Sequence, residues 1–400
     1  MNRVLRISIF TIIACSTVGL HQPRQARSSE SVPERLPPRP ERTAEERKSK
    51  AEELRRIYAG DPATWPAPHV DPDIAWKEIG LLPDVIHPDD NPHTEAKAAL
   101  GKTLFFDPRL SGSGQIACAS CHDPDLGWAD GRTTSFGHSR KQLARNAPSI
   151  RNTAFQKHLF WDGRADSLED QARQVLMNPD EMRSGPEHVV ALLEREPGYK
   201  ELWHKAFGAE PVSIERAAQA LACFERTVVG GSSRFDSFMR GNPAALTDEA
   251  LLGMDLFRRE ARCINCHHGP AFSDGGFHDL GLSNYGRPFE DIGRGRITND
   301  PADTGKFRTP SLRDATATLP LMHNGLFELQ VALTLYNAGM PTPIRKESQT
   351  DDPRFPVKSP HLKPLGLNKQ DLADLTAFLT SLEETKRRIR PPTIPGLGEP

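Results

Sequence analysis

The chain has 400 residues, with 51 lysines and arginines against 53 acidic residues and a formal net charge of −2. Because these charges are spread along the chain and nearly cancel, they give no electrostatic basis for binding nucleic acid. The length suggests two ordinary domains with extensions. The 35 prolines and 30 glycines favour helices joined by long irregular loops.

Residues 1–26 are typical of an export signal, in which "MNRVLR" is basic, "ISIFTIIACSTVGL" is apolar and the chain then turns polar. The apolar run is too short to span a bilayer. Within it, Ile12-Ile13-Ala14-Cys15 resembles a bacterial lipobox. The alternatives are simple cleavage and lipidation at Cys15, which would add a lipid anchor. Either route predicts a periplasmic location.

Proline-rich segments lie at both ends of the mature chain. Residues 27–75 are charged and punctuated by prolines, which predicts a tether, a short exposed helix and an extension lying over a domain surface. Residues 389–400 form a second proline-rich segment, which we expect to be a tail.

Between these ends the pattern Leu-Gly-x-x-Leu-Phe occurs twice, starting at Leu100 and at Leu252. Because repeated patterns indicate repeated structural units, we expect two domains of one type, at residues 76–240 and 241–388. The boundary fits the sequence "GNPAALTDEA", where the helix-breaking residues Gly241, Asn242 and Pro243 are followed by Thr247 as the cap of a new helix.

Helical periodicity dominates both predicted domains. Near the end, "LNKQDLADLTAFLTSLEE" places leucines on one helix face, at Leu372, Leu375, Leu379 and Leu382. No stretch shows the convincing alternation of a strand. We therefore predict a mainly α fold with two helical domains and long irregular loops.

Four of the six cysteines form two copies of one motif. The copies are Cys118-Ala119-Ser120-Cys121-His122 and Cys263-Ile264-Asn265-Cys266-His267. In such a motif both thiols can add to the vinyl groups of a haem, and the histidine then lies under the iron. The alternatives are a zinc site and a disulfide. Tetrahedral zinc would need four ligands at each site, and neither segment has a second Cys or His pair nearby at the usual spacing. The motifs predict two covalently bound c-type haems, with His122 and His267 as proximal ligands.

With these motifs in place, residues 75–385 resemble the bacterial di-haem cytochrome c peroxidase and MauG family. The phrases that carry the resemblance include "LFFDPRLSGSGQIACASCH", "GHSRKQLARNAPSIRN", "FWDGR", "NPDEM", "FRTPSLRDAT" and "MHNG". The resemblance implies two cytochrome c-like helical domains with one haem each. The haem of 76–240 would be peroxidatic and that of 241–388 would transfer electrons.

The resemblance also implies roles for four residues of the first domain. His138 would be the displaceable distal ligand of the first haem, and Trp161 would relay electrons between the haems. Gln171 and Glu181 would line the distal pocket, where Glu181 can move a proton between the peroxide oxygens. Taken singly, His138 is equally a loop histidine, Trp161 a core aromatic and Glu181 an acid at a helix start.

A calcium ion between the haems is a further implication of the resemblance. Its ligands would be Asn146 and the backbone carbonyls of Thr318 and Pro320. Because these groups offer only neutral oxygens, the ion would keep several waters.

The sixth ligand of the second haem separates the two branches of the family. Peroxidases use a methionine downstream of "HNG", and MauG-type proteins use a tyrosine. In "HNGLFELQVALTLYNAGM", Tyr336 matches the tyrosine, and Met340 lies one helical turn later. We favour Tyr336 and keep Met340 as the alternative; Met322 is a weaker third choice.

The resemblance implies an exported enzyme that reduces hydrogen peroxide to water at the His122 haem. Electrons would enter through the His267 haem from a small cytochrome c or a cupredoxin. One alternative is a MauG-like oxidase that uses peroxide to oxidise side chains of a partner protein. Another is an electron-transfer cytochrome or redox sensor without catalysis. Similar proteins often form homodimers.

Overall fold

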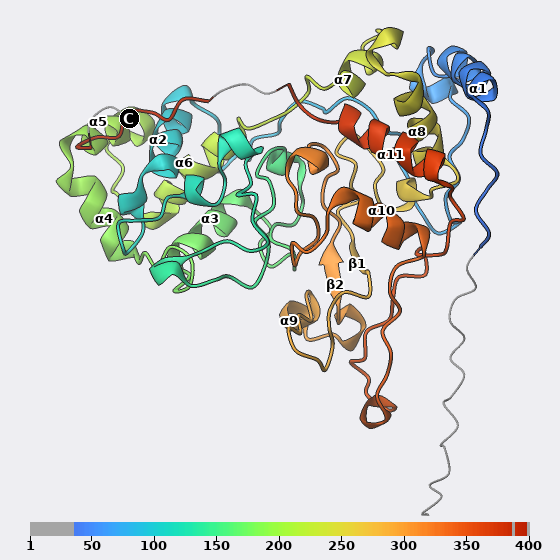
Figure 1. Cartoon of the computed structure of the whole chain (residues 1–400). Helices are drawn as coiled ribbons and strands as arrows, with labels where there is room; N and C mark the ends of the chain where they lie inside the picture. Colours follow the sequence, from blue (N-terminus) through green and yellow to red (C-terminus); the bar gives the residue numbers. More distant parts are fainter. Residues whose placement is uncertain (1–35, 386–388, 398–400) are drawn as a thin grey trace, which may run out of the picture. The chain divides into compact units, whose positions relative to one another are not determined.

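The computed structural model describes residues 36–385 and 389–397. The predicted export signal and Cys15 lie outside the described residues. The described chain is mainly helical, which confirms the predicted fold class (Figure 1). The helices are α1 (Ala44–Ile57), α2 (Glu95–Phe106), α3 (Leu168–Met177), α4 (Pro186–Arg195), α5 (Pro197–Phe207), α6 (Ile214–Glu225), α7 (Arg234–Met239), α8 (Asp248–Arg258), α9 (Gly295–Thr298), α10 (Leu329–Asn337) and α11 (Lys369–Ser381). Within this part of the chain, no helix combines the length and the apolar run that crossing a membrane requires.

Apolar side chains gather in two large clusters. The first core contains buried residues of α2, α3, α4, α5 and α6, between Leu100 and Val228. The second core contains buried residues of α1, α7, α8, α10 and α11, together with parts of the extension, between Ala51 and Leu382. Two cores agree with two helical units, and the domain limits at residues 240 and 241 stay a prediction.

The two copies of the Leu-Gly-x-x-Leu-Phe pattern form equivalent helix contacts. In α2, a side chain at Gly101 would overlap the carbonyl oxygen of Ala220 in α6. In α8, a side chain at Gly253 would overlap the carbonyl oxygen of Asp374 in α11. Glycine is therefore needed at both positions because the two helix backbones approach too closely for a Cβ atom. The glycine of the repeated pattern marks a helix crossing.

The predicted short helix near the N-terminus is present as α1, which is mostly exposed but has one buried face. In α1, Ala51 and Leu54 are buried against the second core, and Tyr58 and Trp65 follow them into the same cluster. Figure 1 shows α1 beside α8. The sequence did not reveal this buried face, because only one residue in three or four of α1 points inward and most of the others are charged.

The proline-rich tail lies over the first core. Ile389 packs against that core, and Pro395 lies against Gly198 at the start of α5. Arg109 donates a hydrogen bond from Nη2 to the carbonyl of Pro395 at 2.6 Å. In Figure 1 the described part of the tail, residues 389–397 in dark red, runs next to α5. Each end of the described chain therefore packs on the core that is built mainly from the other part of the sequence.

Contrary to the prediction of no strands, the described chain contains a small antiparallel sheet. Strand β1 (Phe277–Asp279) pairs with β2 (Lys306–Arg308), and Phe277 lies opposite Arg308. With three residues each, the strands are too short to show an alternating pattern in the sequence.

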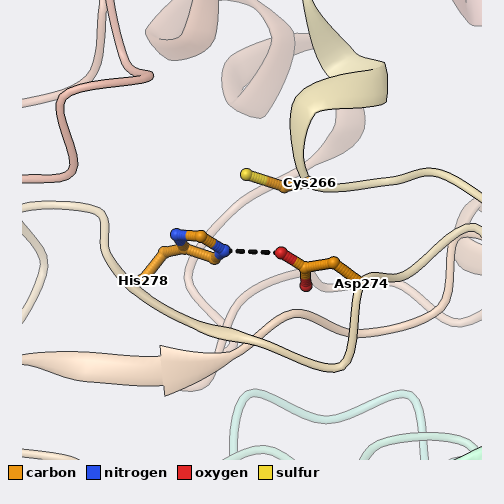
Figure 2. A group of neighbouring side chains, drawn as sticks. All are labelled: Cys266, Asp274 and His278. Atoms are coloured by element: carbon orange, nitrogen blue, oxygen red, sulfur yellow. Dashed lines mark hydrogen bonds and ion pairs between the residues drawn. The ribbon is translucent and has the colours of Figure 1, made fainter. Parts of the chain in front are cut away.

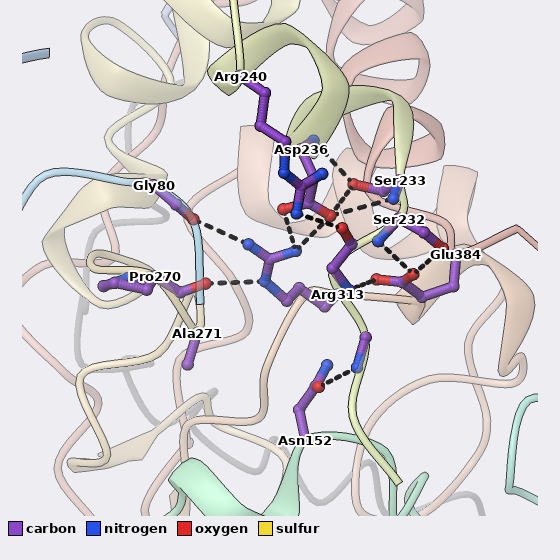
Figure 3. Close-up of polar contacts among 12 residues, drawn as sticks. Gly80, Asn152, Ser232, Ser233, Asp236, Arg240, Pro270, Ala271, Arg313 and Glu384 are labelled. Carbon is purple, nitrogen blue, oxygen red and sulfur yellow. Dashed lines mark hydrogen bonds and ion pairs between the residues drawn. The ribbon is translucent and has the colours of Figure 1, made fainter. Parts of the chain in front are cut away.

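A buried ion pair joins segments that are far apart in the sequence (Figure 3). Arg313 and Asp236 are both buried, and Arg313 Nη1 lies 3.0 Å from Asp236 Oδ1. The remaining guanidinium donors bond the carbonyls of Pro270 and Gly80, each at 2.8 Å. Because every charged group has partners, this arrangement satisfies the requirement for burying a charge and fixes four segments around the second core.

Candidate haem-binding sites

The first Cys-x-x-Cys-His motif follows α2 and begins with a short 3-10 turn at Cys118–Ser120. The turn brings the amide of His122 to the carbonyl of Cys118, at 3.0 Å. His122 Nδ1 lies 3.1 Å from the carbonyl of Trp128, to which it donates. Trp128 is itself fully buried, with 1 % of its surface exposed. This bond leaves Nε2 of His122 as the ligand atom.

The second motif repeats this geometry after α8. Its 3-10 turn spans Cys263–Asn265, and the amide of His267 bonds the carbonyl of Cys263 at 2.8 Å. His267 Nδ1 lies 2.9 Å from the carbonyl of Phe272, another fully buried residue. Two motifs 145 residues apart thus have the same tautomer-fixing bond to a carbonyl.

Both motifs fit a covalently bound haem. The sulfurs of Cys118, Cys121, Cys263 and Cys266 are free thiols, as attachment to two vinyl groups requires. Burial lowers the pKa of both His122 and His267, which keeps the imidazoles neutral and able to bind iron. The carbonyls that orient them could not be found in the sequence, because a backbone carbonyl has no residue-specific signal.

Beside the second motif, Cys266, Asp274 and His278 converge (Figure 2). His278 Nε2 lies 2.8 Å from Asp274 Oδ2. Although burial opposes it, the hydrogen bond to Asp274, with a contribution from Cys266, raises the pKa of His278 to about 10. The three side chains offer ligand atoms for a metal ion, but Cys266 is committed to a haem. Once its sulfur is a thioether, Asp274 is the remaining group that raises the pKa of His278, and burial still opposes it.

The structure brings the segments of His138 and Glu181 together. The amide of His138 donates to the carbonyl of Asp180 at 2.9 Å, and a side chain at Gly137 would overlap that same carbonyl. Arg183 Nη1 lies 3.2 Å from His138 Nε2. Sequence reasoning did not single out Arg183, because an exposed arginine near a loop has no distinguishing pattern.

Glu181 is enclosed near the first motif. Burial raises the pKa of its carboxyl group, against the opposing charge of Arg164 and a hydrogen bond from Asn178. Burial also raises the pKa of the Cys121 thiol to about 11, and the charges of Asp130 and then Glu181 add to that shift. Glu181 therefore lies near the haem-attachment site. Gln171 is half-buried on α3, with no side-chain hydrogen bond to the described residues.

Trp161 is buried where three segments meet. Its Nε1 donates to the carbonyl of Asn146 at 2.9 Å, and its carbonyl accepts from the amide of Arg308 at 2.8 Å. Its ring lies 6.4 Å from that of His323, in an edge-on arrangement. His323 in turn stacks on Phe307, with ring centroids 3.6 Å apart. The sequence did not reveal this aromatic stack, because its members are remote along the chain.

The residues predicted to bind calcium lie on neighbouring segments. The amide of Asn146 bonds the carbonyl of His323 at 2.8 Å, which brings Asn146 to the segment that follows Thr318 and Pro320. The side-chain Nδ2 of Asn146 donates to the carbonyl of Arg132 at 2.8 Å. Its Oδ1 makes no hydrogen bond with the described residues. The assignment of a calcium ion here stays a prediction.

Tyr336 and Met340 lie at the end of α10. Burial, followed by the charges of Cys266 and Cys263, raises the pKa of the Tyr336 hydroxyl group. The hydroxyl group therefore lies near both cysteines of the second motif. Met340 follows the helix with a positive φ of 59° and is 4 % exposed. The structure brings Tyr336 to the second motif, and its role as a ligand stays a prediction.

The fold and the two equivalent motifs define a di-haem c-type cytochrome. Residues 95–244 match the family model described as di-haem cytochrome c peroxidase. The chain is 40% identical over 316 residues to the methylamine utilization protein MauG of Methylorubrum extorquens, an alignment that covers 78% of this chain and 85% of that protein. It is 36% identical over 353 residues to the cytochrome-c peroxidase IdrP1 of Pseudomonas sp. (strain SCT), covering 80% and 90%.

A solved structure of a MauG-like protein is similar to this chain in fold and sequence. A MauG-like protein associated with microbial copper homeostasis aligns with a TM-score of 0.68 and 34% identity, over 76% of this chain and 95% of that one. The chain therefore belongs to the di-haem cytochrome c peroxidase family, as the sequence motifs predicted. It is an oxidoreductase whose family carries two c-type haems.

Proposed function

We propose that the chain reduces hydrogen peroxide to water at the haem bound by Cys118, Cys121 and His122. The observation that carries this proposal is the pairing of the His138 segment with half-buried Glu181 beside that motif. A displaceable ligand and a proton-transferring carboxyl group on contacting segments are what peroxide cleavage needs. When bound, the haem supplies the electrons and the iron centre of the reaction.

The protein side chains then handle the peroxide protons. In its carboxylate form, Glu181 takes a proton from one peroxide oxygen and returns it to the oxygen that leaves as water. Its enclosure limits exchange of that proton with solvent. The Gln171 amide, which has no protein partner among the described residues, orients the peroxide by hydrogen bonding.

Electrons would enter through the haem of Cys263, Cys266 and His267, from a small cytochrome c or a cupredoxin. We assign the relay to Trp161, because its ring is buried and held by bonds at both the indole nitrogen and the backbone carbonyl. A calcium ion held by Asn146, Thr318 and Pro320 would stiffen the neighbouring segments.

A MauG-like oxidation of a partner protein is the second candidate. The proximity of Tyr336 to Cys266 and Cys263 favours it, because a tyrosine in that place is the family feature of MauG. If Tyr336 binds the second haem, replacing it by phenylalanine changes the absorption spectrum of that haem. An unchanged spectrum contradicts this branch and leaves Met340 as the ligand to test.

Titration with peroxide, followed by haem absorption, distinguishes the candidates. The peroxidase proposal expects a reaction only in the half-reduced protein, because His138 must first leave the iron. His138→Ala should then react in the fully oxidised state. A reaction of the fully oxidised wild-type protein indicates the MauG-like activity. If peroxide changes the haem absorption in neither oxidation state, both enzymatic proposals are contradicted and only electron transfer remains.

We further propose that the protein works in the periplasm, because residues 1–26 are typical of an export signal. Mass spectrometry of the protein purified from the periplasmic and membrane fractions tests this location. A mature N-terminus at a lipid-modified Cys15 would establish the lipoprotein alternative, and an intact Met1 would contradict export. Association of two copies stays a prediction from the family resemblance.

A further inference from the structure

Four described arginines are less than a tenth exposed, and one of them differs from the others. They are Arg226, Arg258, Arg308 and Arg313. Three form ion pairs, Arg226 with Glu169, Arg258 with Glu78 and Arg313 with Asp236. Arg308 has no carboxylate of the described residues within ion-pair distance. Buried charges in proteins are almost always paired, so Arg308 calls for an explanation.

The hydrogen bonds of Arg308 do not provide a counter-charge. Nε donates to the carbonyl of Phe160 at 3.2 Å, and Nη1 donates to the carbonyl of Thr309 at 3.3 Å. Both acceptors are neutral, and both bonds are long. Burial without an anion lowers the pKa of the guanidinium to about 10. The polypeptide alone therefore leaves a buried positive charge, which is costly unless an anion is supplied from elsewhere.

Arg308 lies between the predicted electron relay and the second haem motif. Its amide bonds the carbonyl of Trp161 at 2.8 Å. The next residue, Thr309, bonds the carbonyl of Gly276 with its amide at 2.9 Å and accepts from Ser273 Oγ at 2.7 Å. Ser273 and Gly276 belong to the loop that follows His267. A buried cation is thus fixed beside the loop of the second haem.

A c-type haem carries two propionate carboxylates, which are the anions this position needs. We propose that Arg308 is the counter-ion of a propionate of the haem attached to Cys263 and Cys266. The planar guanidinium can donate two parallel hydrogen bonds to a carboxylate. A fixed positive charge next to that haem favours its reduced state. Arg308 is then a positioning residue that raises the reduction potential of this haem.

The effect on potential requires only that the haem is bound, whereas any effect on turnover rests on the proposed function. The test is a spectroelectrochemical titration of the holoprotein and of Arg308→Gln, with both haems followed by their separate absorption and EPR signals. At the wild-type midpoint, we expect the reduced-to-oxidised ratio of the second haem to fall about tenfold in Arg308→Gln. This corresponds to about 59 mV for a one-electron couple.

Lys306→Gln is the matched control. Lys306 lies two residues earlier on β2, carries the same charge and already pairs with Asp303 at 3.2 Å. Its loss should therefore change the reduced-to-oxidised ratio of each haem, measured at the wild-type midpoint, by no more than about twofold. If Arg308→Gln does not retain two haems, Arg308→Lys replaces it. There we expect a fall of about threefold, because an ammonium group meets a carboxylate at a single point.

Two outcomes overturn the proposal. Unchanged potentials of both haems in the Arg308 variants would show that no propionate depends on this guanidinium. A shift confined to the haem of Cys118 and Cys121 would show that the assignment to the second haem is wrong. Because the potentials are measured without peroxide, neither outcome depends on whether the protein is a peroxidase.

Discussion

Glu181 is half-buried on a segment that also holds the backbone of His138. Replacing it by glutamine keeps the shape of the side chain and removes the proton transfer. We expect peroxide turnover by Glu181→Gln to fall about 10²- to 10⁴-fold, with unchanged haem spectra. Stopped-flow kinetics measures the fall, and Glu187→Gln, an exposed acid at the start of α4, serves as the control. Equal loss in both variants would contradict a specific role.

The pH dependence of turnover follows from the same residue. The carboxylate form of Glu181 accepts the proton, and burial raises the pKa of this group in the folded protein. Activity should therefore be lost on the acidic side at a higher pH than an ordinary glutamate would give. This acidic limb should be absent from the residual activity of Glu181→Gln.

Asp71 links the N-terminal extension to the second haem motif. Its amide bonds Asn265 Oδ1 at 2.8 Å, and its carboxylate accepts from Arg262 and from His361. The hydrogen bond from Arg262, followed by that from His361, lowers the pKa of Asp71 to about 2. The folded-state value lies below the ordinary value of 3.8. The resulting stability is therefore present above about pH 4 and is lost as the pH falls toward about 2.

We expect Asp71→Asn to unfold at lower denaturant concentration near neutral pH and to lose less stability than wild type on acidification. Unfolding curves at several pH values, followed by far-ultraviolet circular dichroism, measure both effects. Asp73→Asn is the matched control, because Asp73 is 71% exposed. An acid dependence of Asp71→Asn as steep as that of wild type would contradict this role.

The haem-attaching residues could be predicted from the sequence because covalent attachment needs its ligands within five consecutive residues. The pocket on the other side of the haem is different, because His138, Glu181 and Tyr336 come from separate segments. Only the family resemblance identified them. Arg308 and His323 lie within two of the phrases that carry the resemblance. The sequence assigned them no role, because their distinctive property is the environment that folding creates.

Helices α8 and α11 cross at Gly253, where the backbones approach too closely for a side chain. Gly253→Ala must push the helices apart, and we expect a loss of about 1–3 kcal/mol in the free energy of unfolding. Chemical denaturation of the holoprotein measures it. Gly80→Ala is the control, because a Cβ atom at Gly80 would meet nothing within 4 Å. Equal stability of Gly253→Ala and wild type would contradict the close crossing.

The strongest helices were predictable because their caps and periodicity are local. Thr247 caps α8, and Leu375 and Leu379 of α11 are buried in the second core. The packing of α1 was not predictable, because its inward face holds only a few apolar residues among many charges. The strands β1 and β2 form through pairing between residues remote in the sequence, and neither is long enough to be recognised from the sequence alone.

At the scale of the whole molecule, the tail acts as a strap on the first core. Removing residues 389–400 takes away the packing of Ile389 and the bond between Arg109 and Pro395. We expect the first core to lose about 1–2 kcal/mol. Hydrogen exchange should show lower protection in α4 and α5. The protection of α8 and α11 is the internal control, and equal loss in all four helices would contradict a local strap.

The crossed packing of the chain ends has a consequence for dissection of the molecule. A cut of the chain between α7 and α8 separates the two motifs. It also leaves α1 on the N-terminal fragment, although α1 packs in the second core with α8 and α11 of the C-terminal fragment. The same cut removes the tail from the first core. Neither fragment then holds a whole interior. During synthesis, likewise, α1 can pack in the second core only after α8 and α11 have been made. The first core gains its contact with Ile389 only after that residue has been made. Both cores are therefore completed late in synthesis.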